Sequence, residues 1–492
     1  MLIMPDNTLF TPVTDPNMQE NRTDAKHIDM ELRYHTFEEV EKTYTKEEAD
    51  NEAARCLQCP THWCQKECPA GVPVTEFIGK VQKGDLEGAY QLIRTASNLP
   101  EICSRVCPQD KQCQSNCTRS IRNEAVGIGR LERYVVEQHY ANGIPEPSAP
   151  STGKKVAIIG SGPAGLSAAQ SLISAGHAVS VYERADRIGG LLEYGIPNMK
   201  LDKGIVARKA ESLSQQGVNF ILNTNVGVDI TAEELLSEYD AVLLTVGTGS
   251  ARTLDLNGAK EKGIKGIYPA VAFLASNTKS LLDSDLKDGK NISAEGKNVV
   301  IIGGGDTGND CLGTSLRTGA LSVTQIEMLP QSVGREIVIL SRTQRPKEKK
   351  VDTSQEEFRT KFQKDPHIYQ TTVKEVLVDE KLNPTAVVTV DLKPVYDDHF
   401  RLKMEEIPGS EKELPCELLI IAAGFIGPEA YIADSFSVET DARSNIKTNH
   451  YSTNIDKLFA CGDCRTGQSL VVKAMVDGRD CAKAVNDYLK EC

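Results

Sequence analysis

Eight cysteines lie close together in the first third of the 492-residue chain, at spacings that are typical of metal ligands. They follow the patterns C-x2-C-x4-C-x3-C and C-x3-C-x5-C-x3-C, at Cys56, Cys59, Cys64, Cys68, Cys103, Cys107, Cys113 and Cys117. Thiolates grouped on loops and helix ends suit iron–sulfur clusters, which take soft ligands. Structural zinc is the main alternative. Because the region has only one C-x2-C pair, and so lacks paired zinc knuckles, the pattern favours clusters.

A glycine-rich turn follows the apolar, β-branched run Lys155–Ile159 and has the form G-x-G-x-x-G. Its residues are Gly160, Ser161, Gly162, Pro163, Ala164 and Gly165. In this fingerprint the first glycine makes the tight turn, the second lets a pyrophosphate approach the backbone, and the third lets helix and strand pack closely. Glu183 ends the next strand-like run about 20 residues later, where a carboxylate can hold a ribose hydroxyl. The stretch predicts a dinucleotide site.

The same pattern occurs a second time, after the strand-like run Asn298–Ile302. This turn contains Gly303, Gly305, Asp306, Thr307 and Gly308, and its acidic residue is Glu327. Two dinucleotide sites in one chain predict hydride transfer between two cofactors, of which one is a flavin that stays bound and the other is exchanged. Hydride transfer depends on positioning more than on acid–base chemistry. We therefore name no catalytic acid or base.

Strands and helices must hold these residues in place, and their order along the chain predicts an α/β fold with two Rossmann-like units. A helical cysteine domain is expected at 1–150, with a helix that begins within Phe37–Lys46 and a linker at Pro145–Ser151. A flavin domain is expected at 151–290 and 425–492. The second unit, 291–424, is inserted within it and is expected to bind the nicotinamide nucleotide.

Composition excludes several classes of partner. The formal net charge of −13 and the pI near 5.3 argue against nucleic acid and against an anionic membrane surface. No apolar run approaches the roughly 18 residues of a membrane span, and residues 1–22 lack the apolar core of a signal peptide. A disulfide framework is disfavoured without a secretory signal. We therefore expect a cytoplasmic protein.

The cysteine block, with Leu99–Asp110 and Ile128–Arg133, resembles the small (beta) subunit of glutamate synthase. The N-terminal region of dihydropyrimidine dehydrogenase is similar too. The resemblance runs from about Cys56 to the C-terminus and implies FAD, NAD(P)H and two [4Fe-4S] clusters. It implies one cluster on Cys56, Cys59, Cys64 and Cys117, and another on Cys68, Cys107, Cys113 and the carboxylate of Glu132. Cys103 would be a spare buried thiol.

Further cofactor residues follow from the strand ends and from this resemblance. Glycine-rich segments are expected to wrap the flavin, and the late strand Leu458–Ala460 is expected to place Asp463 at the ribityl chain. The helix that starts near Ser469 would point its positive end at the flavin. The flavin residues are Gly190, Leu191, Gly247, Gly462, Asp463, Ser469 and Leu470. Those at the close of the nicotinamide domain are Ala423 and Gly424.

The second acidic residue bears on the choice of nucleotide. Glu327 stands where relatives that prefer NADP carry arginines, and its carboxylate would repel a 2′-phosphate, so we predict NADH over NADPH. Arg335 or Arg342 could swing in from the following loop to bind that phosphate, so NADPH stays an alternative. The resemblance implies a large acceptor subunit that carries FMN and makes glutamate. Another acceptor (ferredoxin, a sulfur species, a pyrimidine-reducing subunit) and a redox-inactive assembly role are the alternatives.

Overall fold

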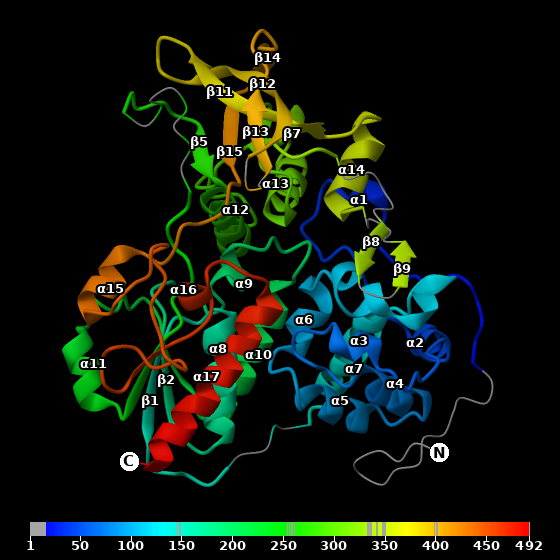
Figure 1. The fold of residues 1–492 in the computed structure, drawn as a ribbon, viewed down its shortest axis with the longest axis vertical. Helices are drawn as coiled ribbons and strands as arrows, with labels where there is room; N and C mark the ends of the chain where they lie inside the picture. The colour runs from blue at the N-terminus through cyan, green and yellow to red at the C-terminus, as the bar shows by residue number, and fades with distance from the viewer. Residues whose placement is uncertain are drawn as a thin grey trace.

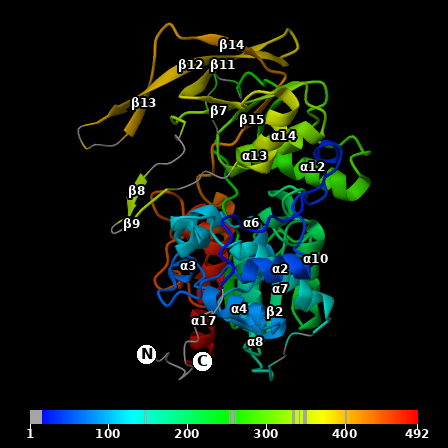
Figure 2. The same cartoon turned by 90° about the vertical axis from the view of Figure 1, so that its right-hand side faces the viewer.

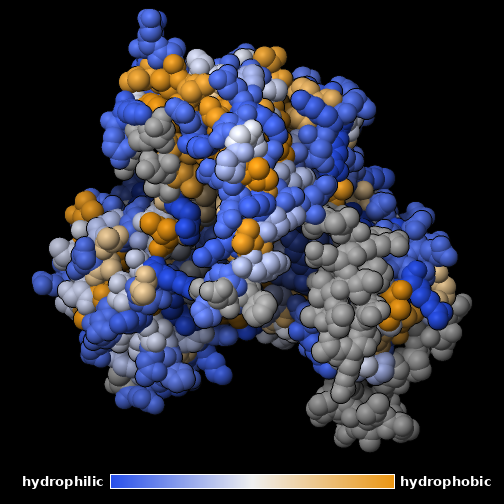
Figure 3. All heavy atoms as spheres, turned by 45° about the horizontal axis from the view of Figure 1, so that its top comes forward, coloured by the Kyte–Doolittle hydropathy of each residue, from blue (hydrophilic) through white to orange (hydrophobic). Residues whose placement is uncertain are grey.

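The structure, a computed structural model, describes residues 16–144, 146, 149–252, 254, 256, 259, 261–331, 337–340, 343–346, 351–397, 399 and 402–491. Figure 1 shows three bodies: a helical one built from the N-terminal part, an α/β body beside it, and a second α/β body above both. The surface of the whole protein is mostly hydrophilic on the face shown in Figure 3, and hydrophobic residues are scattered among the hydrophilic ones.

The helical body carries the cysteine region. Its longest helix, α7 (Ile128–Ala141), turns a stripe of apolar side chains inward. The helix expected to begin within Phe37–Lys46 begins at the last residue of that range, because Thr45 and Glu48 form a capping box there. The other elements are α1 (Met30–Arg33), α2 (Lys46–Ala53), α3 (Trp63–Lys66), α4 (Val74–Gln82), α5 (Leu86–Arg94), α6 (Pro100–Val106), η1 (Gln109–Lys111), η2 (Cys113–Asn116) and η3 (Thr118–Ile121).

The first α/β body is a parallel five-stranded sheet in the order β16-β4-β1-β2-β3. Its strands are β1 (Lys155–Ile159), β2 (Ala178–Tyr182), β3 (Asn219–Ile221), β4 (Ala241–Leu244) and β16 (Leu458–Ala460). One face packs against α8 (Pro163–Ser174), α10 (Lys203–Gln215) and α17 (Val471–Glu491). The other packs against α11 (Ala232–Glu238) and α15 (Ala430–Phe436). Two short helices, α9 (Leu191–Tyr194) and α16 (Asp463–Thr466), follow strand ends.

The second α/β body is a parallel sheet in the order β10-β7-β6-β15-β5. Its strands are β5 (Ile267–Pro269), β6 (Asn298–Ile302), β7 (Ser322–Glu327), β10 (His367–Tyr369) and β15 (Leu418–Ile421). Helices α12 (Ala270–Ser284), α13 (Asp306–Arg317) and α14 (Thr353–Phe362) cover one face. The expected boundary at residue 291 is too late for this sheet, because β5 pairs with β15.

An antiparallel sheet that the sequence analysis did not predict covers the other face of the second body. It consists of β11 (Thr371–Val378), β12 (Pro384–Tyr396), β13 (Leu402–Glu406) and β14 (Lys412–Pro415). Figure 2 shows it at the end of the molecule away from the helical body. A hairpin of β8 (Ile337–Leu340) and β9 (Thr343–Pro346) reaches back toward the cysteine region (Figure 1).

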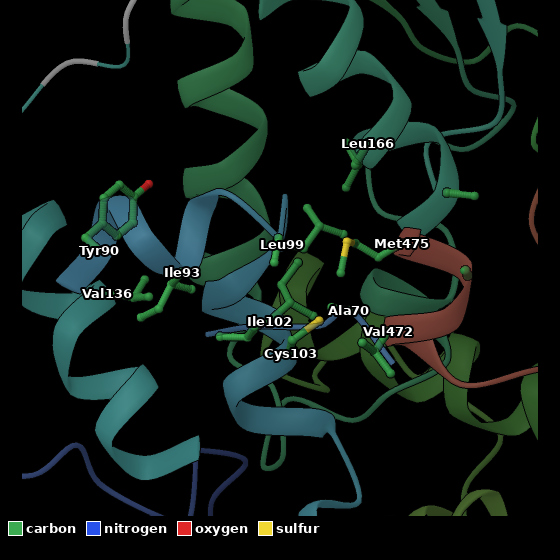
Figure 4. Packing of buried hydrophobic residues seen from close by; sticks show 14 of the residues in the cluster. Ala70, Tyr90, Ile93, Leu99, Ile102, Cys103, Val136, Leu166, Val472 and Met475 are labelled. Carbon is green, nitrogen blue, oxygen red and sulfur yellow. The ribbon is translucent and has the colours of Figure 1, made fainter. Parts of the chain in front are cut away.

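The helical body and the first α/β body share one hydrophobic core. In Figure 4, Leu99, Ile102 and Cys103 of the helical body lie beside Val472 and Met475 of α17. These five side chains are at most 4% exposed. Burial of this kind stabilises by roughly 25 cal/mol per Å² of apolar surface. The cysteine region is therefore packed directly against the helix that follows the last strand of the first sheet.

Candidate functional site

The first glycine turn is built as the fingerprint requires. Gly160 has a φ of +102°, and a Cβ on Gly165 would lie 2.1 Å from the carbonyl oxygen of Gly160, so both positions need glycine. A Cβ on Gly162 would meet nothing within 4 Å. Pro163 and Ala164 then open α8, whose first amides have no partner within the helix. The open space at Gly162 is a cradle that a pyrophosphate fits.

Glu183 closes this turn from the end of β2. One carboxylate oxygen accepts hydrogen bonds from the Ser161 amide at 3.0 Å and the Ser161 hydroxyl at 2.6 Å. The other accepts from the Ala185 amide at 2.9 Å. The Ser161 hydroxyl also accepts from the amide of Gly189 at 2.9 Å, so it joins the turn to the next glycine loop. Ser161 was not among the predicted site residues, and its place inside the fingerprint was the available signal.

Residues from three later parts of the chain gather around the first turn. A Cβ on Gly190 would lie 3.1 Å from the Cα of Gly162, and one on Gly462 would lie 2.7 Å from the Cβ of Ala164. Gly190 directly precedes Leu191, which opens α9 and is 40% exposed. Gly247 follows β4 with a φ of +65° and open space at its Cβ position. Of the predicted flavin residues, Gly190 and Gly462 therefore lie directly against the first turn.

Asp463 is the first residue of α16, and Ser469 lies on the loop between α16 and α17. The Ser469 hydroxyl donates to a carboxylate oxygen of Asp463 at 2.8 Å. Burial raises the pKa of Asp463 above its usual value, while the bonds from Ser469 lower it. Leu470 directly precedes α17, which begins at Val471. The free N-terminal amides of that long helix therefore lie beside the loop predicted to hold the flavin.

The second glycine turn repeats the first on another sheet. Gly303 has a φ of +122°, and a Cβ on Gly308 would lie 2.2 Å from the carbonyl oxygen of Gly303. A Cβ on Gly305 would meet nothing within 4 Å. Asp306 and Thr307 form the first turn of α13 and are exposed. This turn too leaves a cradle for a pyrophosphate.

Glu327 ends β7 beside this second turn. Its carboxylate accepts from the amide of Gly304 at 3.0 Å and from the amide of Leu329 at 2.9 Å. The acid is therefore held at the rim of the turn, as Glu183 is in the first. Arg335 and Arg342, the basic residues that left NADPH open, lie outside the described residues.

The two nucleotide sites meet through a residue that the sequence analysis missed. The side-chain oxygen of Gln468 accepts from the amide of Phe425 at 2.9 Å, and a Cβ on Gly424 would lie 2.7 Å from its side-chain nitrogen. Gly424 and Ala423 follow β15 of the second sheet, whereas Gln468 directly precedes Ser469. The edge of the second site therefore contacts the loop of the first. No motif marks Gln468.

Four of the cysteines line one cavity in the helical body. Cys56, Cys59, Cys64 and Cys117 face it, with the side chain of Trp63 at its border. Burial raises the pKa of the Cys56 thiol, and the other three thiols raise it further. These four are the side chains that the resemblance assigned to one cluster.

The second set lies next to the first. Burial raises the pKa of the Cys113 thiol, and so do Cys68, Glu132 and Cys64. Burial and Glu101 raise the pKa of Glu132 to about 8. The nearby Glu132 and Cys113 also raise the pKa of the Cys107 thiol. The expected spare thiol, Cys103, is 4% exposed and hydrogen-bonds to Cys107.

The chemistry of both sets fits iron–sulfur clusters. Each brings several groups that become anions into a buried space, where they raise one another's pKa, and iron would turn this repulsion into attraction. Within the described part of the chain, no three His, Cys, Asp or Glu side chains converge on a point where a single metal ion would sit.

None of the helices in the described ranges has both the length and the apolar composition that a membrane span requires.

Two sequence families match this arrangement. Residues 33–144 match the family described as dihydropyrimidine dehydrogenase domain II, 4Fe-4S cluster. Residues 154–478 match the pyridine nucleotide-disulphide oxidoreductase family. FprA from Mycobacterium tuberculosis in complex with NADPH shares the fold, with a TM-score of 0.54 and 19% identity, over 69% of this chain and 85% of that one. Fold and site define an NAD(P)H-dependent flavin and iron–sulfur oxidoreductase.

The relatives narrow this class. The chain is 39% identical to "Glutamate synthase [NADPH] small chain" of Bacillus subtilis, over 96% of this chain and 97% of the relative. It is 41% identical to "Glutamate synthase [NADH]" of Schizosaccharomyces pombe over 92% of its length, and spans 22% of that longer protein. The chain belongs to the glutamate synthase small-chain family. The family and the α/β fold with an N-terminal iron–sulfur domain, both predicted from sequence, are confirmed.

Proposed function

We propose that this chain oxidises NADH and delivers its electrons, one at a time, to a partner subunit that makes glutamate from glutamine and 2-oxoglutarate. The contact of Gln468 with Phe425 carries the proposal, because it joins the edge of one nucleotide site to the loop of the other. The cysteine sets adjoin the same body through the shared core. When bound, FAD converts a hydride into single electrons and the clusters carry them.

The chain's own residues hold and orient these groups. We assign FAD to the first site, through Gly160, Gly162, Pro163, Ala164, Gly165, Glu183, Gly190, Leu191, Gly247, Gly462, Asp463, Ser469 and Leu470. We assign the nicotinamide nucleotide to the second, through Gly303, Gly305, Asp306, Thr307, Gly308, Glu327, Ala423 and Gly424. Backbone amides of the two turns would donate to the phosphates, and the carboxylates of Glu183 and Glu327 would accept from ribose hydroxyls. Holding the two rings together is the catalytic contribution.

We assign two [4Fe-4S] clusters to the helical body. The two sets of side chains each supply the four ligands that one cluster needs. They are Cys56, Cys59, Cys64 and Cys117 for one cluster, and Cys68, Cys107, Cys113 and Glu132 for the other. Because Cys64, of the first set, raises the pKa of Cys113, of the second, the two sets lie near each other, and we infer that the clusters would be close enough to exchange electrons.

The preference for NADH rests on Glu327. Its two oxygens are fixed by the amides of Gly304 and Leu329, so the carboxylate cannot easily turn away from the ribose. A 2′-phosphate there would meet a fixed negative charge, whereas a 2′-hydroxyl can donate to it. The large-chain partner follows from the relatives, since the longer fission-yeast glutamate synthase contains a region like this chain. The seven cysteines assigned as ligands must stay reduced, which suits the cytoplasm.

One anaerobic titration tests the proposal. The purified chain is titrated with NADH and, separately, with NADPH, while absorbance follows the flavin and electron paramagnetic resonance follows the clusters. We expect NADH to bleach the flavin and to produce reduced-cluster signals, with NADPH less effective. Iron and sulfide analysis should give two clusters per chain. Zinc in place of iron, or no bleaching by either nucleotide, would overturn the proposal. Glutamate formation after adding a large subunit tests the acceptor.

A further inference from the structure

A three-residue segment of the flavin body, Asn198–Lys200, lies where all three bodies meet. It follows α9, whose first residue is the predicted flavin residue Leu191, and precedes α10. Its side chains and backbone contact the nicotinamide body on one side and the amino-terminal segment on the other. No motif in the sequence marks it.

Lys200 reaches across to the nicotinamide body. Its ammonium lies 2.5 Å from a carboxylate oxygen of Asp310 on α13 and 3.0 Å from one of Asp352, the N-cap of α14. Burial raises the pKa of Asp310 to about 6 against the attraction of Lys200. The two carboxylates raise the pKa of Lys200 despite its burial. The lysine therefore neutralises two acids that would repel each other without it.

Met199 packs against α13 at Gly313, where any larger residue would collide with it. A Cβ on Gly313 of α13 would lie 2.4 Å from the terminal methyl carbon of Met199 and 2.4 Å from the hydroxyl oxygen of Ser354. The methionine is 3% exposed. The segment is therefore joined to α13 by close packing as well as by charge.

The amino-terminal segment backs this contact from the other side. The Asn198 amide group donates to the carbonyl of Phe37 at 2.8 Å, and the Val40 amide donates to the carbonyl of Met199 at 3.0 Å. Arg317, at the end of α13, donates to the carbonyl of Thr36 at 2.9 Å. Residues 36–40 thus hold the segment and α13 together.

We propose that Asn198–Lys200 is an interdomain lock and that Lys200 is a positioning residue for hydride transfer. One end of the lock is four residues beyond α9, which bears the flavin residue Leu191; the other is on α13, which begins with Asp306 and Thr307 of the nucleotide turn. A shift of α13 would therefore move the nicotinamide relative to the flavin. Displacements of about 1 Å from a reactive geometry can cost about 100-fold in rate. The inference rests on the proposed function.

Two substitutions disturb the lock in different ways. Lys200→Met removes the cation and leaves Asp310 and Asp352 facing each other. Gly313→Ala keeps every charge and pushes Met199 away. Lys279→Met is the matched control, because Lys279 also joins the two bodies, pairing with Asp186, but is about half exposed. Exposed pairs contribute little.

The test uses the complete holoprotein in anaerobic stopped-flow, with the nucleotide that reduces the native chain. We expect both lock variants to slow flavin reduction at saturating nucleotide by about 100-fold, with normal flavin and iron contents and a little-changed nucleotide dissociation constant. Hydrogen exchange in α13 and α14 should become faster in both. Lys279→Met should match the native chain.

Failure of the interdomain lock and failure of the proposed function would give different results. If the native chain is reduced and both lock variants are reduced equally fast, with unchanged exchange in α13 and α14, Lys200 has no positioning role. If slower reduction is explained entirely by weaker nucleotide binding, the lock is again rejected. If neither nucleotide reduces the native chain, it is the proposed function that fails.

Discussion

The two glycine turns have the same design but differ in how far they are closed. In the first, Ser161 is fully buried and Glu183 is 7% exposed, and Gly190 and Gly462 close over the turn. In the second, Gly304 replaces the serine, and Gly305, Asp306 and Thr307 are exposed. A closed site suits a cofactor that stays bound, and an open one suits a cofactor that is exchanged every turnover. The difference supports our proposal that FAD stays bound in the first site and that the nicotinamide nucleotide is exchanged at the second.

The third glycine of each turn gives the largest expected effect. In Gly165→Ala and Gly308→Ala, the new Cβ meets a backbone oxygen at 2.1 Å and 2.2 Å, which rotation of a side chain cannot relieve. We expect about 3 kcal/mol of lost binding, or more than about 100-fold in affinity. Gly165→Ala should purify without flavin. Gly308→Ala should keep flavin and clusters but resist reduction by NADH.

Absorbance of the purified variants and stopped-flow reduction measure these outcomes. Gly289→Ala is the control: it also strains a backbone position, with a φ of +65°, but its Cβ would meet nothing within 4 Å and it lies on the connection between α12 and β6, outside both turns. If Gly308→Ala lost the flavin and Gly165→Ala kept it, the assignment of the two sites would be reversed.

Glu327→Gln should give the next largest effect. Glutamine keeps an oxygen for the Gly304 amide but removes the charge that opposes a 2′-phosphate. We expect kcat/KM for NADPH relative to NADH to rise by about 10-fold, or about 1.4 kcal/mol. Glu417→Gln is the control, since its carboxylate accepts from the Asn298 amide at 2.7 Å at the far end of β6. An unchanged ratio would remove Glu327 from nucleotide choice.

Ser161→Ala should make the first turn behave more like the second. It removes the hydroxyl that joins Glu183 to Gly189, while the backbone amide still reaches the acid. A lost hydrogen bond to a charged group costs about 1.5–3 kcal/mol, so flavin should be held at least about 10-fold more weakly. Ultrafiltration measures the released flavin. Ser435→Ala, which removes a hydroxyl bonded to a helix carbonyl at 2.6 Å, should release none.

The smallest expected effect is on the pH dependence of flavin retention. We assigned Asp463 to the ribityl chain, and a carboxylate accepts a hydroxyl proton more strongly than a protonated carboxyl group does, so retention should fall as pH drops through its pKa. Because burial raises that pKa, the fall begins above the usual range for aspartate. Ser469→Ala removes a bond that lowers the pKa and should move the fall to higher pH. Ser469→Thr should restore it. If retention in Ser469→Ala fell at a lower pH than in the native chain, the Ser469 hydroxyl would not be lowering the pKa of Asp463.

The turns, their acids and the grouping of the cysteines were readable from sequence because each is a local pattern with a fixed spacing. The contacts of Lys200 with Asp310 and Asp352 were not, since nothing in a local pattern indicates which distant acids a lysine will meet. Gln468 was missed for the same reason. The three-residue strand β5 is too short to show a period, so the second sheet was expected to start too late.

The antiparallel sheet was missed for a different reason. Strands such as β13 and β14 are largely exposed and rich in charged residues, so they lack the apolar alternation that marks a half-buried strand. Only tertiary pairing with β12 makes them strands. The sequence did not show what the described amino-terminal residues do, because their contacts are with distant parts of the chain: Arg33 pairs with Glu356, Phe37 accepts from Asn198, and Glu41 accepts from Arg130.

The position of β16 sets an order of events during synthesis. Its partner β4 ends at Leu244, yet β16 begins at Leu458, after the whole nicotinamide body has left the ribosome. Domains fold as the chain emerges, N-terminal parts first, so the nicotinamide body folds before the sheet around it is complete. A chain stopped just before β16 would have every cysteine of the two sets and both glycine turns. It would lack the last strand of the first sheet and the flavin residues that follow it, so we expect that it could not retain FAD.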